Sequence, residues 1–440
     1  MTRNAAPQTS PTVLTIAGSD SGGGAGIQAD LKTIEATGGF GTSAITSVTA
    51  QNTTGVRESH LLPIDHVEAQ IEAVLEDFDV RAAKTGMLAA GEVIETVVEY
   101  ADDLPHLVVD PVMVAASGDR LIEPAAEDAY EQLVGEATLV TPNADEAAVL
   151  TGIEPTEEET AVAAGEALLD MGSDAALVKG GHIAGEDIMD VLVTDDHVRT
   201  FRHERIDTEA THGSGCTLSA AIATHLGRGE TLIDGVSAGI DLLARAIRYN
   251  LDVGKGPGAA HHLVETRERA ARTETTEAVA SLVETFLERN VGRLIPEVGT
   301  NVVGATPYAE RVGEVAAVDG RLTRTRDGVV PGRGVRFGAS THVARYLLDA
   351  REIDAGYRFA VNWRYDNSIG DALAELPGDV VRVREVPTLE SGVVSELTAA
   401  ADPVAVVDPG GDRRVPVTVL LARSPDGLEA RTGQLLEAVP

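Results

Sequence analysis

The chain has 440 residues, and because an ordinary domain holds roughly 100 to 200 residues, two units are expected. Its 70 acidic residues against 35 basic ones give a net charge of −35 at pH 7, which argues against nucleic acid as a partner. The hydrophobic share of 43% is that of a globular chain and not of a disordered one, and no uncharged apolar stretch of about 18 residues suggests a membrane span.

The first expected element is a buried strand over Val13–Ile16, followed by a glycine cluster at Ala17–Gly26 and a helix over Ile27–Thr37. The glycines let the backbone approach a ligand closely, although an ordinary strand-to-helix turn explains the cluster equally well. The spacing is neither that of a Walker loop nor that of a dinucleotide fingerprint. The alternation of strand, turn and helix predicts an α/β fold with a mostly parallel sheet.

Three later apolar runs are also expected to be buried strands, and each is followed directly by polar, glycine or proline positions. The runs are Leu107–Val109, Thr138–Val140 and Ala176–Val178; the positions that follow them are Asp110–Pro111, Thr141–Asn143 and Lys179–Gly181. In open α/β sheets the ligand crevice lies at the carboxyl ends of the strands. These three segments are therefore predicted to converge on one site.

Asn143 and Glu146 are three residues apart, on one face of a helix that begins there. An amide and a carboxylate in this arrangement can hold Mg²⁺ through water. A simple N-cap with an acidic first turn is the other interpretation. The preceding strand directs both side chains toward the predicted crevice, which favours the metal.

Lysine occurs only four times, at Lys32, Lys84, Lys179 and Lys255. One of the four, Lys179, directly follows a buried strand, where a point charge could contact a nucleotide phosphate.

The second glycine cluster, Thr211–Thr217, leads into an apolar helix over Leu218–Leu226. Small residues at a helix N-terminus expose backbone N–H groups and form an anion hole suited to a phosphoryl group. Cys216 lies in the first turn, where the helix dipole can lower its pKa and hold a thiolate or a polarised S–H. A small buried hydrophobe is the alternative for a lone cysteine.

A charged, threonine-rich stretch without apolar periodicity separates the two units. We place a linker at residues 266–277, between a first domain at 1–265 and a second at 278–440. Ala278–Glu288 has an amphipathic pattern, which predicts a helix that opens the second domain.

The second domain has no lysine and one histidine, His342. His342 ends a glycine-rich segment that begins at Gly332 and leads into an expected helix over Val343–Leu348, with Ser340 or Thr341 as the N-cap. Phosphate could bind at that helix N-terminus. A lone histidine is more often structural, but Arg321 and Arg336 are near it in the sequence and favour a functional role.

From about Thr12 to Leu263 the chain closely resembles the hydroxymethylpyrimidine (phosphate) kinases of thiamine biosynthesis, which have a ribokinase-like three-layer fold. The matching strings, in chain order, are TIAGSDSGGGAGIQADLKT, TAQNTTGV, KTGML, DPVMVAASGD, TPNADEA, KGGH and THGSGCTLSAAIA. The resemblance implies phosphorylation from ATP with Mg²⁺ and gives roles to particular residues. It implies a pyrimidine pocket lined by Gly18, Asp30, Gln51, Met87, Val112 and Cys216, with Gln51 and Asp30 suited to an aminopyrimidine edge.

The same resemblance implies that Asn143, Lys179 and Thr211 bind ATP, that Glu146 and Asp110 serve the metal, and that Gly213, Gly215, Cys216 and Lys179 take part in catalysis. Many ribokinase-like sugar kinases have an aspartate base where this chain has Cys216, which makes the base less certain than the anion hole. Pyridoxal is an alternative substrate, because enzymes with this cysteine arrangement phosphorylate it too.

The second domain resembles thiamine phosphate synthase domains of the ThiN type, through PEVGTNVVGA, GRGVRFGASTHVARYLLDA and the region around VVDPGG. The resemblance implies that hydroxymethylpyrimidine diphosphate is joined to a thiazole phosphate, with Arg321 and His342 in catalysis and Arg336 on phosphate. Asp408–Arg414 departs from the family pattern. A sensor that binds thiamine phosphates without catalysis is the alternative.

The acidic, lysine-poor composition indicates a salt-rich cytoplasm, because the self-repulsion is screened when the Debye length falls to about 3 Å at 1 M salt. The single cysteine excludes an intramolecular disulfide, and no secretory signal pattern is visible at the start of the chain. We therefore expect a cytoplasmic homo-oligomer that acts on small molecules.

Overall fold

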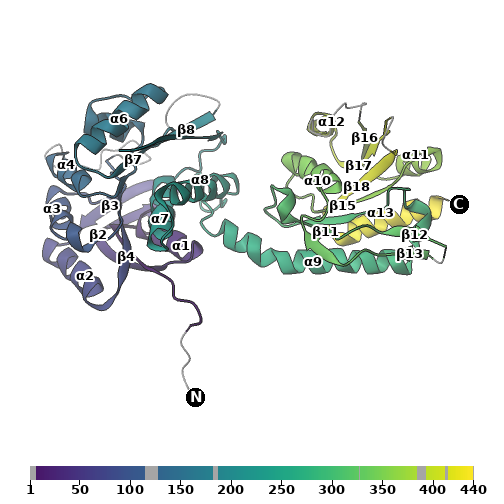
Figure 1. The fold of residues 1–440 in the computed structure, drawn as a ribbon, viewed down its shortest axis with the longest axis horizontal. Coiled ribbons are helices and arrows are strands. Elements are labelled where there is room, and N and C mark those ends of the chain that lie inside the picture. Colours follow the sequence, from purple (N-terminus) through teal and green to yellow (C-terminus); the bar gives the residue numbers. More distant parts are fainter. Residues whose placement is uncertain are drawn as a thin grey trace, which may run out of the picture. The chain divides into compact units, whose positions relative to one another are not determined.

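The computed structural model describes residues 6–113, 127–181, 187–326, 328–383, 393–411 and 415–439. The chain divides into two compact units, Met1–Glu265 and Thr266–Pro440, and each is described here by itself (Figure 1). In the described parts of the chain, no helix is both long enough and apolar enough to cross a membrane.

A nine-stranded sheet in the order β3-β2-β1-β4-β5-β6-β7-β8-β9 forms the centre of the first unit. Its strands are β1 (Thr12–Asp20), β2 (Phe40–Asn52), β3 (Gly55–Leu61), β4 (Val80–Thr85), β5 (Leu107–Val109), β6 (Leu139–Val140), β7 (Ala175–Val178), β8 (Asp187–Thr194) and β9 (Val198–Glu204). Neighbours from β2 to β7 pair in parallel, while β3, β8 and β9 add antiparallel edges. The predicted α/β class with a mostly parallel sheet is confirmed.

Helices cover both faces of this sheet (Figure 1). They are α1 (Gly26–Ala36), α2 (Ile64–Asp77), α3 (Gly91–Glu99), α4 (Glu127–Gly135), α5 (Ala144–Thr151), α6 (Glu158–Asp170), α7 (Ser214–Gly227) and α8 (Leu232–Arg248), with the short 3-10 turn η1 (Ala101–Asp103). One apolar core joins the sheet to α2, α3 and α4, and another joins it to α1, α7 and α8. The result is a three-layer sandwich.

The alternation of side chains along each strand explains why the central strands are apolar throughout. On β5, Leu107 and Val109 pack into the core beneath α2–α4, and Val108 packs into the core beneath α7. Successive side chains of a strand point to opposite faces, so a strand covered by helices on both faces needs apolar residues at every position. Their polar successors then stand at the edge where the strands end.

The second unit has a seven-stranded sheet in the order β14-β11-β10-β15-β18-β17-β16, antiparallel except for β16 and β17. Its strands are β10 (Val302–Ala305), β11 (Val315–Val318), β14 (Val335–Phe337), β15 (Phe359–Arg364), β16 (Asp379–Arg382), β17 (Pro403–Asp408) and β18 (Val417–Ala422), beside the separate hairpin β12 (Thr323–Thr325) and β13 (Gly328–Val330).

The helices of the second unit are α9 (Val264–Glu288), α10 (His342–Ile353), α11 (Asn367–Ala374), α12 (Val394–Thr398) and α13 (Pro425–Ala438), with 3-10 turns η3 (Val291–Leu294) and η4 (Val312–Glu314). One core contains side chains of α9, α11 and α13, and another contains side chains of α10 and α12. The fully buried Trp363 of β15 meets Phe286 of α9 edge to face, with 5.4 Å between ring centroids. This unit is the second α/β domain expected from the sequence.

The segment 266–277, which we predicted as a linker, is helical and forms part of α9. Its inward positions are polar but buried: Glu268 accepts a hydrogen bond of 2.6 Å from the Thr306 hydroxyl, and Thr275 bonds to the Ala271 carbonyl. Arg272 lies over the Phe337 ring. The linker prediction was wrong in this respect. The buried side chains in this part of the helix are polar and hydrogen-bonded, so the sequence shows no apolar repeat at helical spacing.

Candidate active site

The carboxyl ends of β5, β6 and β7 bring together the polar positions that follow each strand. Lys179 Nζ lies 2.9 Å from Asp110 Oδ1, and the Asp110 carboxylate is buried. Lys179 also donates its backbone N–H to the Pro142 carbonyl, and Asn143 pairs with Lys179 as a parallel bridge. Segments that are up to 69 residues apart in the chain thus meet at one edge, as the sequence predicts.

The N-terminus of α7 reaches the same edge. Gly213 is its N-cap with φ 80°, a left-handed conformation that favours glycine, and a Cβ there would collide with the Gly24 carbonyl. A Cβ on Gly215 would lie 3.2 Å from Asp110 Oδ2 and 3.3 Å from Lys179 Nζ. The first turn of α7 therefore lies close to the Lys179–Asp110 pair. The exposed Thr211 precedes this turn, and its carbonyl accepts from the Ser214 N–H at 3.0 Å.

Glu146 and Asn143 form the capping box that was the alternative to a metal site. Asn143 caps α5 by accepting from the Glu146 N–H, and Glu146 Oε2 accepts from the Asn143 N–H at 2.8 Å. Burial raises the pKa of Glu146 to about 7; Lys179 opposes this shift and Asp110 adds to it.

A buried pair of carboxylates with excess negative charge fits Mg²⁺, which prefers oxygen ligands and usually takes one or two carboxylates beside substrate phosphates. Glu146 and Asp110 would be those carboxylates. Among the described residues no group of three or more His, Cys, Asp or Glu side chains stands ready for a metal. Phosphate oxygens and water would complete the shell.

Cys216 carries a protonated thiol, contrary to the thiolate that its place in the first turn of α7 suggested. Burial raises the pKa of Cys216 to about 11, and this outweighs the lowering effects of Lys84 and of a hydrogen bond from the Gly26 backbone. The helix terminus lowers a thiol pKa only where the anion keeps some solvation, whereas burial here favours the neutral form. The raised pKa argues against the thiolate, while the polarised S–H and the small buried side chain both stay predictions.

Asp30, predicted to pair with a pyrimidine, is fully buried and already bonded. Its two carboxylate oxygens lie 2.9 and 3.0 Å from Lys84 Nζ, and the Thr15 hydroxyl donates to Oδ2 at 2.6 Å. It supports the site from beneath and does not offer an edge to a ligand. Sequence reasoning missed Lys84 as its partner, although the scarcity of lysine was a signal.

Three further predicted pocket residues are Gly18 in β1, Met87 after β4 and Val112 after β5. Gly18 donates to the Met87 carbonyl at 3.1 Å, and a Cβ on Gly18 would lie 2.6 Å from Met87 Cε and 2.7 Å from Ser47 Oγ. Val112, half-buried, follows Asp110 and donates its N–H to the Asp110 carbonyl. Gly18 therefore allows the Met87 side chain to lie across β1.

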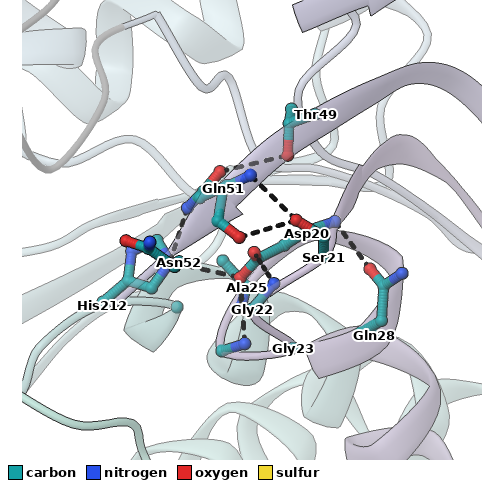
Figure 2. A network of polar contacts seen from close by, with 12 residues as sticks. Asp20, Ser21, Gly22, Gly23, Ala25, Gln28, Thr49, Gln51, Asn52 and His212 are labelled. Atoms are coloured by element: carbon teal, nitrogen blue, oxygen red, sulfur yellow. Dashed lines mark hydrogen bonds and ion pairs between the residues drawn. The ribbon is translucent and has the colours of Figure 1, made fainter. Parts of the chain in front are cut away.

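Gln51 belongs to a polar network at the glycine cluster after β1 (Figure 2). Asp20 accepts from the N–H groups of Gly22, Gly24 and Ala25 at 2.7 to 2.9 Å. His212 Nε2 lies 2.9 Å from Gln51 Nε2 and 3.4 Å from Asp20 Oδ2. Asp20 and His212 were not predicted as site residues, although both lie inside the glycine-rich strings.

In the second unit, Arg321 and Arg336 lie near the end of β11. Arg336 Nε is 3.2 Å from Asp319 Oδ2, and Arg321 donates to the Val298 carbonyl. Beneath them is a buried amide pair that the sequence analysis did not single out. The Asn301 N–H donates to Asn362 Oδ1 at 2.7 Å, and the Asn301 side chain bonds both the N–H and the carbonyl of Val318.

His342 begins α10 and meets the Tyr346 ring edge to face, with 5.3 Å between centroids. The Tyr346 hydroxyl donates to Asp408 Oδ2 at 2.9 Å, so His342 and the carboxyl end of β17 are joined through one tyrosine. The predicted N-cap is only partly correct: Thr341 is the N-cap residue but makes no capping hydrogen bond through its side chain. The backbone N–H groups there are not capped by Thr341.

Some residues of the sequence motifs lie outside the described residues. They are Val114–Asp119, His182 and Asp412–Arg414.

Residues 20–261 match the family model described as phosphomethylpyrimidine kinase, and residues 278–432 match thiamine-phosphate synthase ThiN. A hydroxymethylpyrimidine/phosphomethylpyrimidine kinase of Haemophilus influenzae is 45% identical over 262 residues, which cover 58% of this chain and 97% of that protein. Its counterpart from Streptomyces coelicolor is 45% identical over 265 residues, which cover 60% of this chain and 98% of that protein. The pyridoxal kinase of Bacillus subtilis, solved as an ADP complex, superposes with a TM-score of 0.55 at 31% identity, covering 59% of this chain and 99% of that one.

Proposed function

Because the chain belongs to the phosphomethylpyrimidine kinase family, we propose that its first unit transfers phosphoryl groups from ATP to hydroxymethylpyrimidine and then to its monophosphate. The observation that carries the proposal is the meeting of the α7 N-terminus with Lys179 and Asp110 at the carboxyl ends of the strands. A transferring phosphoryl group spreads negative charge over its oxygens, and fixed N–H dipoles beside a lysine stabilise that charge.

Each group has a separate task in this scheme. The N–H groups from Gly213 to Cys216 receive the phosphoryl oxygens, and Lys179 contacts a nucleotide phosphate. Asp110 and Glu146 would hold Mg²⁺, which neutralises phosphate charge when it is bound. Asn143 and Thr211 lie beside them as nucleotide contacts.

The neutral Cys216 thiol positions the substrate hydroxymethyl group and does not act as a standing base. A loose phosphoryl-transfer transition state needs little deprotonation of the attacking hydroxyl in advance. A thiol with a pKa of about 11 is compatible with that requirement. The Cys216→Ser variant, which keeps a donor, should therefore lose less turnover than Cys216→Ala.

We assign to the second unit the joining of hydroxymethylpyrimidine diphosphate with a thiazole phosphate, with release of diphosphate. Arg321, Arg336 and His342 would stabilise the leaving group. The alternative is a sensing module that binds the product without making it. The experiment that distinguishes synthase from sensor is to supply the full chain with both substrates in concentrated salt. Formation of thiamine phosphate would show the synthase.

The test of the kinase is ATP-dependent phosphorylation of hydroxymethylpyrimidine and of its monophosphate by the full chain. Cys216→Ala should cripple this turnover and leave thiamine phosphate formation from supplied diphosphate intact. The second candidate function is phosphorylation of pyridoxal, and the superposition on a pyridoxal kinase is the observation that favours it. Faster turnover of pyridoxal than of hydroxymethylpyrimidine would support this candidate. Loss of both activities in the variant would indicate misfolding.

We further propose that the acidic, lysine-poor composition adapts the chain to concentrated salt. The support is the excess of 70 acidic over 35 basic residues.

A further inference from the structure

One ring nitrogen of His212 faces two groups that make opposite demands on it (Figure 2). Gln51 Nε2 lies 2.9 Å away, and an amide nitrogen can only donate. Asp20 Oδ2 lies 3.4 Å away, and an ionised carboxylate can only accept. The nitrogen can accept a hydrogen bond from Gln51 only when it carries no proton, and it can donate one to Asp20 only when it carries a proton.

The two protonation states of this nitrogen therefore correspond to two orientations of the Gln51 amide. A bare Nε2 accepts from the amide NH₂, which requires a neutral ring with its proton on Nδ1. A protonated Nε2 donates to Asp20 and repels the NH₂ group, so the amide must turn its oxygen toward the ring. The orientation drawn in Figure 2 is the first.

The surroundings fix the Gln51 backbone more firmly than its amide, which the Thr49 hydroxyl contacts at 3.4 Å and His212 at 2.9 Å. The Ser21 hydroxyl donates to the Gln51 carbonyl at 2.6 Å and accepts from the Gln51 N–H at 2.8 Å, which fixes the backbone beside a bulge in β2. A Cβ on Gly24 would lie 3.0 Å from His212 Cδ2, so the ring is packed against the glycine loop.

Asp20 keeps its charge in this setting. Burial alone would raise the pKa of Asp20, but the His212 ring, when its Nε2 carries a proton, and the Ala25 and Gly22 N–H groups in either state lower it below its ordinary value. Lys32 of α1 is another charged group beside this loop, and its Nζ donates to the Gly23 carbonyl at 2.6 Å.

The orientation of the amide decides which ligand edge Gln51 can read. An amide has one edge with an oxygen and one N–H side by side, and a second N–H that points away from that edge. When the second N–H is held by His212, the mixed edge faces away from the ring. Its oxygen already receives a long hydrogen bond of 3.4 Å from the Thr49 hydroxyl but can accept a second one, so the edge complements an amino group beside a ring nitrogen, as in an aminopyrimidine.

We infer that His212 is a specificity-determining positioning residue: its ring nitrogen, when it accepts from the Gln51 side chain, holds the Gln51 amide in the orientation that reads an aminopyrimidine. The inference rests on the proposed function, because it concerns which substrate the kinase site selects. His212 directly precedes Gly213, so the residue that sets the reading edge also begins the anion hole.

The experiment compares 4-amino-5-hydroxymethyl-2-methylpyrimidine with its 4-oxo analogue, which lacks that donor–acceptor edge. The measured quantity is the ratio of the two KM values, with binding of both compounds by calorimetry as a second readout. His212→Leu removes the acceptor and should reduce discrimination by about tenfold, the effect of one lost hydrogen bond, with the KM for ATP unchanged. His212→Gln keeps a hydrogen-bond acceptor and should preserve the discrimination.

Rescue by the acceptor-keeping variant provides the readout that a merely structural residue would not move. Discrimination that is lost in His212→Leu should return in His212→Gln, while the KM for ATP stays the same in both variants. His225→Gln is the matched control, because His225 also lies on the His212–α7 segment but pairs with Glu230. It should behave as the wild type does.

Wild-type discrimination in His212→Leu, or equal losses in the Leu and Gln variants, would overturn the inference while leaving the kinase assignment intact. A wild-type chain that neither binds nor phosphorylates the aminopyrimidine would overturn the proposed function, and this inference with it.

Discussion

Lys84 and Asp30 form an ion pair of 2.9 Å beneath the candidate active site, and neither side chain is exposed to solvent. Burial opposes the charge on Lys84, but Asp30 outweighs it and holds the pKa of Lys84 above its ordinary value. Asp30 belongs to α1 and Lys84 to β4, and the two residues are 54 positions apart in the chain. The pair therefore ties α1 to β4 under the glycine-rich loop.

Removal of one partner should be strongly destabilising. We expect Lys84→Met to lower the free energy of unfolding by about 3–5 kcal/mol, because the Asp30 charge is then buried without a partner. The double variant Lys84→Met, Asp30→Leu should recover much of that loss. Denaturant unfolding in concentrated salt, followed by circular dichroism, measures both.

Arg81→Ala is the control for this series, since Arg81 pairs with Asp79 at 3.6 Å and both side chains are exposed. Exposed pairs contribute about 0–1 kcal/mol. Equal losses of unfolding free energy in Lys84→Met and Arg81→Ala would show that the buried pair contributes no more to stability than the exposed pair does.

Glu146 should give the first unit a distinct pH dependence. Its pKa rises from 4.5 to about 7 on folding, so the folded state binds the extra proton between these values. The stabilising neutral form is complete below pH 4.5 and is lost as the pH rises to 7, an effect of about 3 kcal/mol. The free energy of unfolding is measured for the wild type and for Glu146→Gln, and the second value is subtracted from the first. This difference should fall by about 3 kcal/mol as the pH rises from 4.5 to 7.

Two controls accompany the measurement. Glu158→Gln, at an exposed carboxylate paired with Arg202, should show no such fall, because the pKa of Glu158 is lowered by hydrogen bonds from Thr200 and Arg202. Mg²⁺ should reduce the fall in the wild type, since the ion favours the charged carboxylate. A fall that is insensitive to Mg²⁺ would count against Glu146 as a metal ligand.

In the second unit, His342→Ala should reduce thiamine phosphate formation by about 100-fold or more, the loss typical of a group that stabilises developing charge. Kinase turnover should not change. Tyr346→Phe removes the hydrogen bond to Asp408 but keeps the ring beside His342, so it should have a smaller effect. Coupled assays of both activities on the same preparations test this prediction, and an unaffected synthase in His342→Ala would refute the assignment.

Salt should stabilise both units. With 70 acidic residues against 35 basic ones, dilution from about 1 M to 0.1 M salt lengthens the Debye length from about 3 to 10 Å and exposes the chain to its own repulsion. We expect the melting temperature and both activities to fall. Sucrose, which stabilises by exclusion without screening charge, should not restore them fully; a melting temperature independent of salt would contradict the proposal.

Local pattern by itself determined four of the nine strands of the first unit, β1, β5, β6 and β7, and the place where the polar residues after the last three meet. Leu107–Val109 is a strand with the predicted bounds, and Asp110 meets Lys179 as expected. The reason is that a strand covered on both faces must be apolar, and that parallel strands end at a common edge. Similarly, the turn before α7 places residue 213 in a left-handed backbone conformation, which favours glycine.

Only the tertiary structure decided the state of the charged and reactive groups. The position of Cys216 at a helix N-terminus favours a thiolate, but burial by other elements overrides it. Asp30 is directed to Lys84 instead of a ligand, and the polar segment 266–277 is helical, with Glu268 buried and bonded to Thr306. Solvation and long-range partners set these outcomes, and neither is encoded in the spacing of neighbouring residues.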